Sequence, residues 1–290
     1  MFLPATREEM ARRGWSELDV VLVTGDTYID SPYHGVAAIG QVLVKEGFRV
    51  GIVSQPRTDT IEDISRLGEP KLFWGVSAGC VDSMVANYTS SGKRRNQDDF
   101  TAGGMNDRRP DRASIAYTGL IRRAFKGTVP VVLGGIEASL RRVAHYDWWD
   151  NKIRRGLLFD AKADLLVYGM GELASIELAT RLRDGLPWDD IRGTCRIAKE
   201  KPEDALEIVS FDEIVEDRAK YVDMFRQFYK HSDPVIGKRL AQRHGERWLV
   251  QNPPSPNLTT EQIDRFADIP WELETHPTET VHGPVKAWET

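Results

Sequence analysis

Cysteine is scarce in this sequence, and the metal-binding patterns that cysteine and histidine form are absent. Cys80 and Cys195 are the two cysteines among 290 residues. A pair so far apart does not support a disulfide framework and cannot by itself ligate a metal cluster, so free thiols in a reducing cytoplasm are expected. The six histidines show neither H-x-x-x-H nor H-E-x-x-H spacing. No metal site is therefore predicted for this chain.

Long apolar runs and a basic charge are also missing. No segment approaches the roughly 18 consecutive apolar residues of a membrane helix, and the polar first residues do not predict a signal peptide. The net charge is -5 and the isoelectric point about 5.8, whereas a general nucleic-acid binder would be basic. We therefore expect a cytoplasmic protein that does not contact membranes and does not take nucleic acid as its partner.

The phosphate-binding signatures of nucleotide enzymes are missing as well. The first predicted strand ends in TGDTYID, without the G-x-G-x-x-G fingerprint of a dinucleotide-binding turn, and the P-loop pattern does not occur. NAD binding of the Rossmann type and P-loop nucleotide hydrolysis are therefore not expected.

The sequence does contain an alternation of short apolar runs with amphipathic helical patterns, which is typical of a parallel sheet with helices on both faces. We therefore predict an α/β fold for residues 1–200, with a doubly wound, mainly parallel five-stranded sheet of the flavodoxin-like type. For residues 201–290 we predict a mostly helical extension that ends in a connector. The five predicted strands are residues 19–24, 49–54, 71–77, 129–133 and 164–168.

Three turns rich in glycine and polar residues follow predicted strands of this sheet. Ligands of open α/β sheets bind just past the carboxyl ends of the strands, so these turns together predict one ligand-binding crevice. Their glycines would let a ligand approach the backbone, and their carboxylates would orient its polar groups. Alternatively, the turns have this composition because any strand-to-helix turn favours it. The candidate crevice residues are Asp26, Gly134, Gly135, Glu137, Ser139, Arg141, Arg142, Gly169, Gly171 and Glu172.

Other reactive side chains have simpler interpretations. His34 is interpreted as a surface histidine beside the start of a helix, and Cys80 as a small core residue. Residues 87–111 have no periodicity, and cations alternate with aspartates there. A loop of this length is either solvated and mobile or a lid or docking segment.

Several blocks of the sequence resemble the N-terminal region of the YgiQ-type radical-SAM proteins. A later segment, QRHGERWLVQNPPSPNLTTEQID, is similar to the one that leads into the radical-SAM core of that family, so the resemblance covers nearly the whole chain. The matching blocks are VTGDTYIDSP, FRVGIVSQP, GVSAGCVDSMVANYT, RRPDRASIAYT, VVLGGIEASLRRVAHYDWW and KADLLVYGMGE.

The resemblance implies a cobalamin-binding-like front domain whose turns GGIEAS and GMGE face the corrinoid position. It also implies that a full-length member continues into a partial TIM-like barrel, where a CxxxCxxC motif holds a 4Fe-4S cluster that reductively cleaves S-adenosylmethionine. This chain has no CxxxCxxC, so no catalytic residue is predicted within it. The radical-SAM core is its expected partner, in cis in full-length relatives or as a separate chain.

Cobalamin is a further cofactor that the resemblance brings into consideration. Related domains that ligate cobalt use D-x-H-x-x-G after the first strand, whereas this chain reads Asp26-Thr-Tyr28 at the matching position. Any corrinoid would therefore bind without that histidine, and no cofactor is firmly expected for the chain itself.

The leading hypothesis is that the chain is the N-terminal domain of such a protein, of unknown substrate, which caps and shapes the active site of a barrel outside this chain. In that role Arg141 and Arg142 would meet an anionic group or dock on the barrel. The alternatives are a free-standing binding or adaptor module with a flavodoxin-like fold, or a small-ligand enzyme of that fold.

Overall fold

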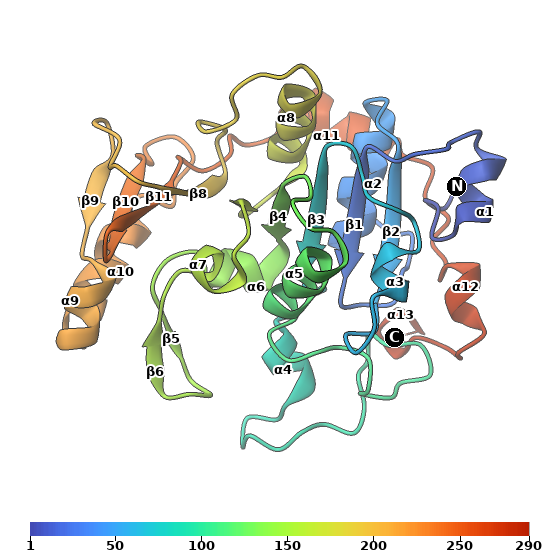
Figure 1. The fold of residues 1–290 in the computed structure, drawn as a ribbon, viewed down its shortest axis with the longest axis horizontal. Coiled ribbons are helices and arrows are strands. Elements are labelled where there is room, and N and C mark those ends of the chain that lie inside the picture. Colours follow the sequence, from blue (N-terminus) through green and yellow to red (C-terminus); the bar gives the residue numbers. More distant parts are fainter. Residues whose placement is uncertain (290) are drawn as a thin grey trace.

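One mixed sheet organises the chain, and the computed structural model describes residues 1–289 of it (Figure 1). The sheet has nine strands in the order β2-β1-β3-β4-β7-β8-β11-β10-β9. The first five strands in this order are parallel to one another. We call them the parallel half of the sheet. They are β1 (Val20–Thr24), β2 (Val50–Ser54), β3 (Phe73–Ser77), β4 (Val131–Gly134) and β7 (Leu165–Val167).

The other four strands form the antiparallel half, in which β8 pairs antiparallel with β7 and β11, and β11 with β10. The edge strand β9 runs parallel to β10. These strands are β8 (Thr194–Ala198), β9 (Leu206–Ile208), β10 (Leu240–His244) and β11 (Arg247–Gln251). The mixed α/β class and the large, mostly parallel sheet are thus confirmed.

The predicted count of five strands is wrong. Three of the additional strands, β9, β10 and β11, lie in residues 201–290, which were predicted as a mostly helical extension. Charged residues at the exposed positions of β10 and β11 obscured the apolar run of each strand, so the segment resembled a charged helix. The two-residue turn at Gly245-Glu246, where Gly245 has a φ of +60°, is the sequence signal for the hairpin that was missed.

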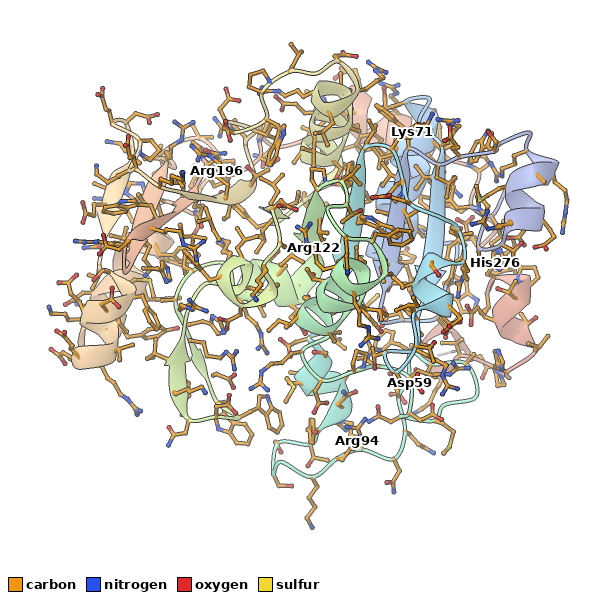
Figure 2. All side chains as sticks on the ribbon, in the orientation of Figure 1. Asp59, Lys71, Arg94, Arg122, Arg196 and His276 are labelled. Atoms are coloured by element: carbon orange, nitrogen blue, oxygen red, sulfur yellow. The ribbon has the colours of Figure 1, made fainter. Side chains whose placement is uncertain are left out.

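Strand side chains alternate between two hydrophobic cores, one on each face of the sheet, as the period of two requires. Val20 and Leu22 point to the face covered by α2 (Gly35–Lys45) and α8 (Glu172–Arg183). Val21 and Val23 point to the opposite face. Side chains fill the space between the sheet and the helices on both faces (Figure 2). The opposite face is covered by α3 (Glu62–Ser65), α5 (Ala113–Ala124) and α7 (Leu157–Ala161).

The core on the opposite face continues into the antiparallel half. Ile208, Leu240 and Leu249 belong to the same cluster of buried side chains as Val21 and Val23. The parallel and antiparallel halves therefore share both a sheet and a core, although a domain boundary was predicted at residue 200. That boundary stays a prediction.

The remaining elements surround the sheet. Figure 1 shows α4, the β5–β6 hairpin and the C-terminal end of the chain on one side of it, at the bottom of the view. None of the helices within residues 1–289 combines the length and apolar character needed to span a bilayer. The hairpin strands are β5 (His145–Asp147) and β6 (Lys152–Arg154), and the helices are α1 (Arg7–Arg12), α4 (Ser83–Asn87), α6 (Gly135–Leu140), α9 (Phe211–Glu216), α10 (Lys220–Lys230), α11 (Thr260–Ala267), α12 (Pro277–Thr280) and α13 (Lys286–Glu289).

Residues 272–289, which we call the C-terminal strap, fold back onto the carboxyl end of the parallel half. The His276 amide donates to the Tyr28 carbonyl at 2.9 Å, just past β1. The Ala287 amide donates to the Asp99 carbonyl at 2.8 Å, and the Gly103 amide donates to the Pro284 carbonyl at 2.9 Å. The strap thus joins the loop after α4 to the edge of the sheet where ligands of α/β proteins bind.

Candidate functional site

A crevice of about 360 Å³ opens at the carboxyl ends of β1, β3, β4 and β7. It reaches from this edge toward the middle of the sheet, where Leu22, Gly75 and Val132 line its inner part, and it lies between α2 and α8. All of its lining residues fall between positions 22 and 175, so the parallel half alone builds it. A largely apolar cavity of this size with a few polar groups at its mouth suits a small ligand.

The structure brings six of the ten predicted crevice residues together here. The three turns converge because parallel strands end at the same edge, as the sequence predicted. Ligand binding by these residues stays a prediction. The six are Asp26, Gly134, Gly135, Gly169, Gly171 and Glu172.

Asp26 is held rigidly at the mouth of the crevice and is 3% exposed. One carboxylate oxygen, Oδ1, forms an ion pair of 2.7 Å with Arg109 Nη1, and Oδ2 accepts a hydrogen bond of 2.6 Å from the Cys80 amide. Gly79 allows this arrangement, because its φ is +116° and a Cβ there would lie 2.1 Å from Asp26 Oδ1. Burial raises the pKa of the Cys80 thiol, so this side chain remains a neutral thiol beside the carboxylate.

His34 is a residue of this crevice that sequence reasoning missed. It is not a surface residue, because it is 6% exposed and lines the crevice at the start of α2. Neither of its ring nitrogens has a hydrogen-bond partner within residues 1–289. Burial lowers the pKa of His34, against the opposing effect of Asp26. The signal was its position directly before a helix, after the first strand, where a side chain faces the ligand edge.

Glu172 provides a second polar group without a partner. Its buried Oε2 atom has no hydrogen-bond partner in the described part of the chain, and it lines the crevice in the first turn of α8. A buried polar atom without a partner is uncommon in native structures, because its desolvation is not compensated. His34 and Glu172 therefore offer hydrogen-bonding groups that a ligand in the crevice would satisfy.

The glycine turns differ in what they require. Gly135 has a φ of +79°, and a Cβ there would lie 2.5 Å from Ser77 Oγ, so the turn itself needs glycine. Gly134 is extended, with a φ of -151°, and a Cβ there would meet nothing within 4 Å. The absence of a side chain at Gly134 thus leaves open space at the crevice wall rather than relieving strain.

The other four predicted residues do not line the crevice. The Glu137 carboxylate is 1% exposed and accepts hydrogen bonds from the Ser83 and Ser114 amides at 2.9 and 3.1 Å, so it links α4, α5 and α6. Arg141 forms an ion pair of 2.6 Å with Asp82. These partners are internal, and they give both side chains a structural task that sequence spacing could not reveal.

Ser139 and Arg142 also make internal contacts. The Ser139 hydroxyl accepts a hydrogen bond of 3.3 Å from the Gly169 amide, which ties two of the glycine turns together. The Arg142 guanidinium lies over the Tyr168 and Phe228 rings at 4.6 and 4.4 Å from their centroids. A ligand-binding or docking role for these residues stays a prediction.

The long loop after α4 is attached to the crevice by a buried arginine. The Arg109 side chain is fully buried and forms ion pairs with Asp26 at 2.7 Å and with Asp98 at 3.0 Å. Burial by itself would lower the pKa of Arg109, but the two carboxylates raise it overall. The loop is therefore anchored to the end of β1 at this point.

The residues present do not supply the metal ligands of the cofactors that the sequence resemblance implies. Within residues 1–289 no group of three or more His, Cys, Asp or Glu side chains is arranged to hold a metal ion. The two cysteines cannot supply the three thiolates of a CxxxCxxC cluster site. Tyr28, at the place of a cobalt-ligating histidine, is fully buried, and its hydroxyl bonds the Leu3 amide at 2.9 Å and Asp30 at 3.2 Å.

The fold and crevice define an α/β domain with a ligand-sized site at its carboxyl edge. A family model described as radical SAM N-terminal matches residues 2–290, and the chain belongs to this family. That result confirms the resemblance found in the sequence.

The relatives are UPF0313 proteins. The chain is 49% identical to one from Fusobacterium nucleatum, and the matched region covers 100% of this chain and 51% of that protein. It is 53% identical to one from Thermotoga maritima, with 100% and 52% covered, and 46% identical to one from Geobacter sulfurreducens, with 99% and 48% covered. The chain thus spans about half the length of these relatives.

Among solved structures, the chain is similar to the radical S-adenosylmethionine methyltransferase TsrM from Kitasatospora setae with cobalamin and a [4Fe-4S] cluster bound. The TM-score is 0.40 and the sequence identity 23%, over 61% of this chain and 26% of that one.

Proposed function

We propose that this chain is the N-terminal domain of a radical-SAM protein and that its crevice forms one wall of the active site. Family membership and the half-length coverage of the relatives support this proposal. The observation that carries it is the crevice itself, in which buried His34 has two ring nitrogens without a partner in residues 1–289. The 4Fe-4S cluster and S-adenosylmethionine, held by residues outside this chain, would supply the radical chemistry.

The crevice residues would bind and orient the part of the substrate that reaches this wall. The neutral His34 imidazole can donate one hydrogen bond and accept another. Glu172 Oε2 accepts a hydrogen bond, and Asp26, fixed by Arg109, keeps the Cys80 turn in place. The apolar inner part excludes water from the bound group. Tyr28 is buried away from the crevice, so a corrinoid in this chain would have no cobalt ligand from that position.

The orientation toward a second domain is supported by the strap. The Trp288 ring lies 6.3 Å from the His34 ring, centroid to centroid, so the strap passes beside the crevice mouth. In relatives of twice this length, polypeptide that follows the strap would begin at the carboxyl edge of the sheet. A core domain placed there would close the open side of the crevice.

The proposal is tested in a fusion of this chain with the second half of the Thermotoga maritima relative. Hydrogen exchange of the fusion should show protection of the amides of residues 26–35, 134–137 and 169–172 relative to the 290-residue chain. The β10–β11 hairpin should exchange equally in both. Protection of the hairpin, with none at the three turns, would contradict the proposal.

A matched pair of histidine variants tests the role of His34 in the same fusion. His34→Asn should reduce substrate-dependent release of 5′-deoxyadenosine by about 10-fold, because a buried hydrogen bond to the substrate is lost. His231→Asn is the control, since His231 is also buried, at 8% exposure, but lies outside the crevice. Equal losses in the two variants would argue against a ligand-facing His34.

A further inference from the structure

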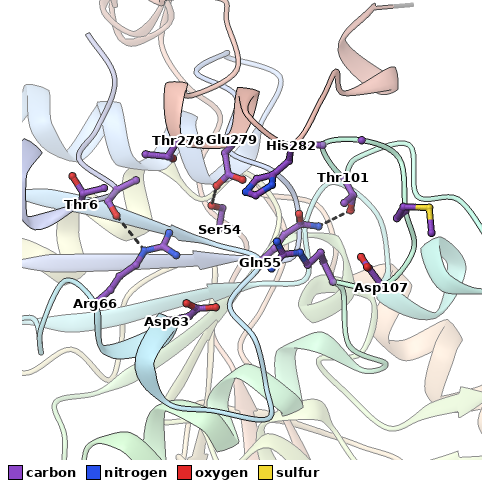
Figure 3. Close-up of a pocket in the computed structure, with 15 residues that line it drawn as sticks. Thr6, Ser54, Gln55, Asp63, Arg66, Thr101, Asp107, Thr278, Glu279 and His282 are labelled. Atoms are coloured by element: carbon purple, nitrogen blue, oxygen red, sulfur yellow. Dashed lines mark hydrogen bonds between the residues drawn. The ribbon is translucent and has the colours of Figure 1, made fainter.

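A second pocket lies at the carboxyl end of β2, beside the crevice but without a lining residue in common with it. Its volume is about 460 Å³, which is within the range of small-molecule sites. The end of β2, the loop after α4, the chain around α3 and the C-terminal strap each form one of its walls (Figure 3). Its lining carries charges of both signs, from Asp63, Asp107 and Glu279 and from Arg66 and Arg108.

Arg66 is one of two arginines that line this pocket, the other being Arg108. The Arg66 Nε donates a hydrogen bond of 3.1 Å to the Ala5 carbonyl, which fixes the guanidinium at the pocket wall. No carboxylate of residues 1–289 forms an ion pair with it. Burial lowers the pKa of Arg66, although Glu279 and Asp63 act in the opposite direction. A partly buried guanidinium without a contacting anion is unfavourable. The two terminal nitrogens of Arg66 can each donate a hydrogen bond to one carboxylate.

Glu279 provides an opposite charge from another wall. One carboxylate oxygen, Oε1, accepts a hydrogen bond from the Ser54 hydroxyl, which holds the strap against β2. Figure 3 shows Glu279 and Arg66 reaching the same space from separate elements, α12 and the end of α3. Asp63 and Asp107 add further negative charge to the lining, and Arg108 adds a second positive charge. A simple anion would be repelled by these carboxylates, whereas a ligand of both charges would be stabilised by both walls.

The backbone at the floor of the pocket is also unusual. Gln55 has a φ of +40°, which is rare for a residue with a side chain. Its Nε2 atom donates to the Gly25 carbonyl at 2.9 Å and to the Thr101 hydroxyl at 2.7 Å. These bonds hold the loop after α4 over the end of β2. Such a conformation persists only where surrounding contacts enforce it, and it is concentrated at binding sites.

We propose that this pocket binds a small zwitterion of the amino-acid type, with its carboxylate on Arg66 and its ammonium group on Glu279. The ligand would bridge the strap and the body of the domain. Because none of the lining residues is shared with the crevice, this binding site does not depend on the proposed active-site role.

The proposal is tested by isothermal titration calorimetry of the 290-residue chain with the common L-amino acids. At least one amino acid should bind saturably at millimolar concentration, and it should bind more tightly than both the matched acid without the amino group and the matched amine without the carboxyl group. If no amino acid binds, or if the deaminated acid binds equally well, the proposal is overturned.

Two variants separate the roles of the charges. Arg66→Gln should weaken binding of the amino acid by about 10- to 100-fold, as expected for loss of a charge-assisted hydrogen bond. Glu279→Gln keeps an acceptor for the Ser54 hydroxyl. This variant should bind the amino acid more weakly and the deaminated acid more tightly than the unchanged chain. Unchanged preferences in Glu279→Gln would overturn the proposal even where Arg66→Gln fails to fold. Arg57→Gln is the control and should bind normally, because Arg57 pairs with Asp59 at 2.7 Å outside the pocket.

Discussion

The two halves of the sheet share a hydrophobic core, but they differ in whether the carboxyl ends of their strands lie at one edge. In the parallel half all strands end at one edge, so their turns converge on the crevice with His34 and Glu172. In the antiparallel half β11 ends at the opposite edge from its neighbours β8 and β10, and β10 returns directly into β11 through Gly245. Strand direction therefore decides which half can gather polar groups around a ligand.

The comparison also explains how the chain uses its charged residues. At the crevice the ions are buried, as in the pairs of Arg109 with Asp26 and Asp98. In the antiparallel half the pair of Arg226 with Asp223 is exposed on α10. Buried ions hold a loop in one position, whereas exposed ions contribute mainly to solubility. Removal of one cation from each half tests whether this division holds.

The largest effect is expected from Arg109→Met. Removal of the guanidinium leaves Asp26 and Asp98 buried without a cation, since both are at most 4% exposed at their side chains. Breaking one partner of a buried ion network lowers the free energy of unfolding by about 3–5 kcal/mol. Urea denaturation would measure this loss.

The matched control is Arg226→Met, in which an exposed ion pair of 3.6 Å is removed from the antiparallel half. Exposed pairs contribute about 0–1 kcal/mol, so the urea midpoint should hardly move. Similar losses in both variants would mean that the Arg109 network does not stabilise the loop as the contacts indicate.

Arg109 also marks a limit of prediction from sequence. Asp26 was identified because a carboxylate at the end of the first strand has a defined place in α/β folds. Its partner is one of several cations in a loop without periodicity, and only the tertiary structure brings it to Asp26 across 83 positions of chain. The internal contacts of Glu137 could not be foreseen for the same reason, since Ser83 and Ser114, which donate hydrogen bonds to it, are distant in sequence.

The fold itself was predictable wherever burial on both faces produced continuous apolar strands. β1, β2 and β3 were located to within one or two residues at each end. β10 and β11 were missed because β10 combines apolar positions with Arg243 and His244, which are compatible with a charged helix until the partner strand is known. Whether such a segment forms a strand or a helix depends on pairing with a partner strand, and that pairing cannot be read from either strand alone.

The second prediction concerns pH and a histidine of the antiparallel half. His244 is stacked on Phe211 at 5.3 Å, and burial lowers its pKa from 6.5 to about 3. Below pH 6.5 the unfolded chain therefore binds a proton that the folded chain does not bind. The free energy of unfolding should fall as the pH drops from 6.5 toward 3, by about 1.4 kcal/mol per pH unit from this residue.

The variant His244→Phe should remove this contribution while it retains the stacking on Phe211. Denaturation series between pH 7 and about pH 4 would show a shallower acid slope for the variant than for the unchanged chain. His145, whose pKa is lowered by burial to about 4, would still destabilise the variant at acid pH. An unchanged slope in His244→Phe would show that His244 does not remain neutral in the folded chain.

The smallest effects on the free energy of unfolding are expected from substitutions of glycines in the two halves. Gly135→Ala combines a φ of +79° with a Cβ only 2.5 Å from Ser77 Oγ, and should lower the free energy of unfolding by about 1–3 kcal/mol. Gly245→Ala, in the β10–β11 turn, has the left-handed φ of +60° without a close contact. It should cost about 1 kcal/mol from backbone conformation alone.

Gly134→Ala completes the series, because its backbone is extended and its Cβ would meet nothing within 4 Å. Its stability should change by less than about 0.5 kcal/mol. The added methyl group nevertheless projects at the crevice wall, so in the fusion with the second half of the Thermotoga maritima relative it should weaken substrate-dependent turnover without a loss of folding. A stable Gly134→Ala fusion with unaltered turnover would show that the open space at this turn is not used by the ligand, and would weaken the distinction between the two halves.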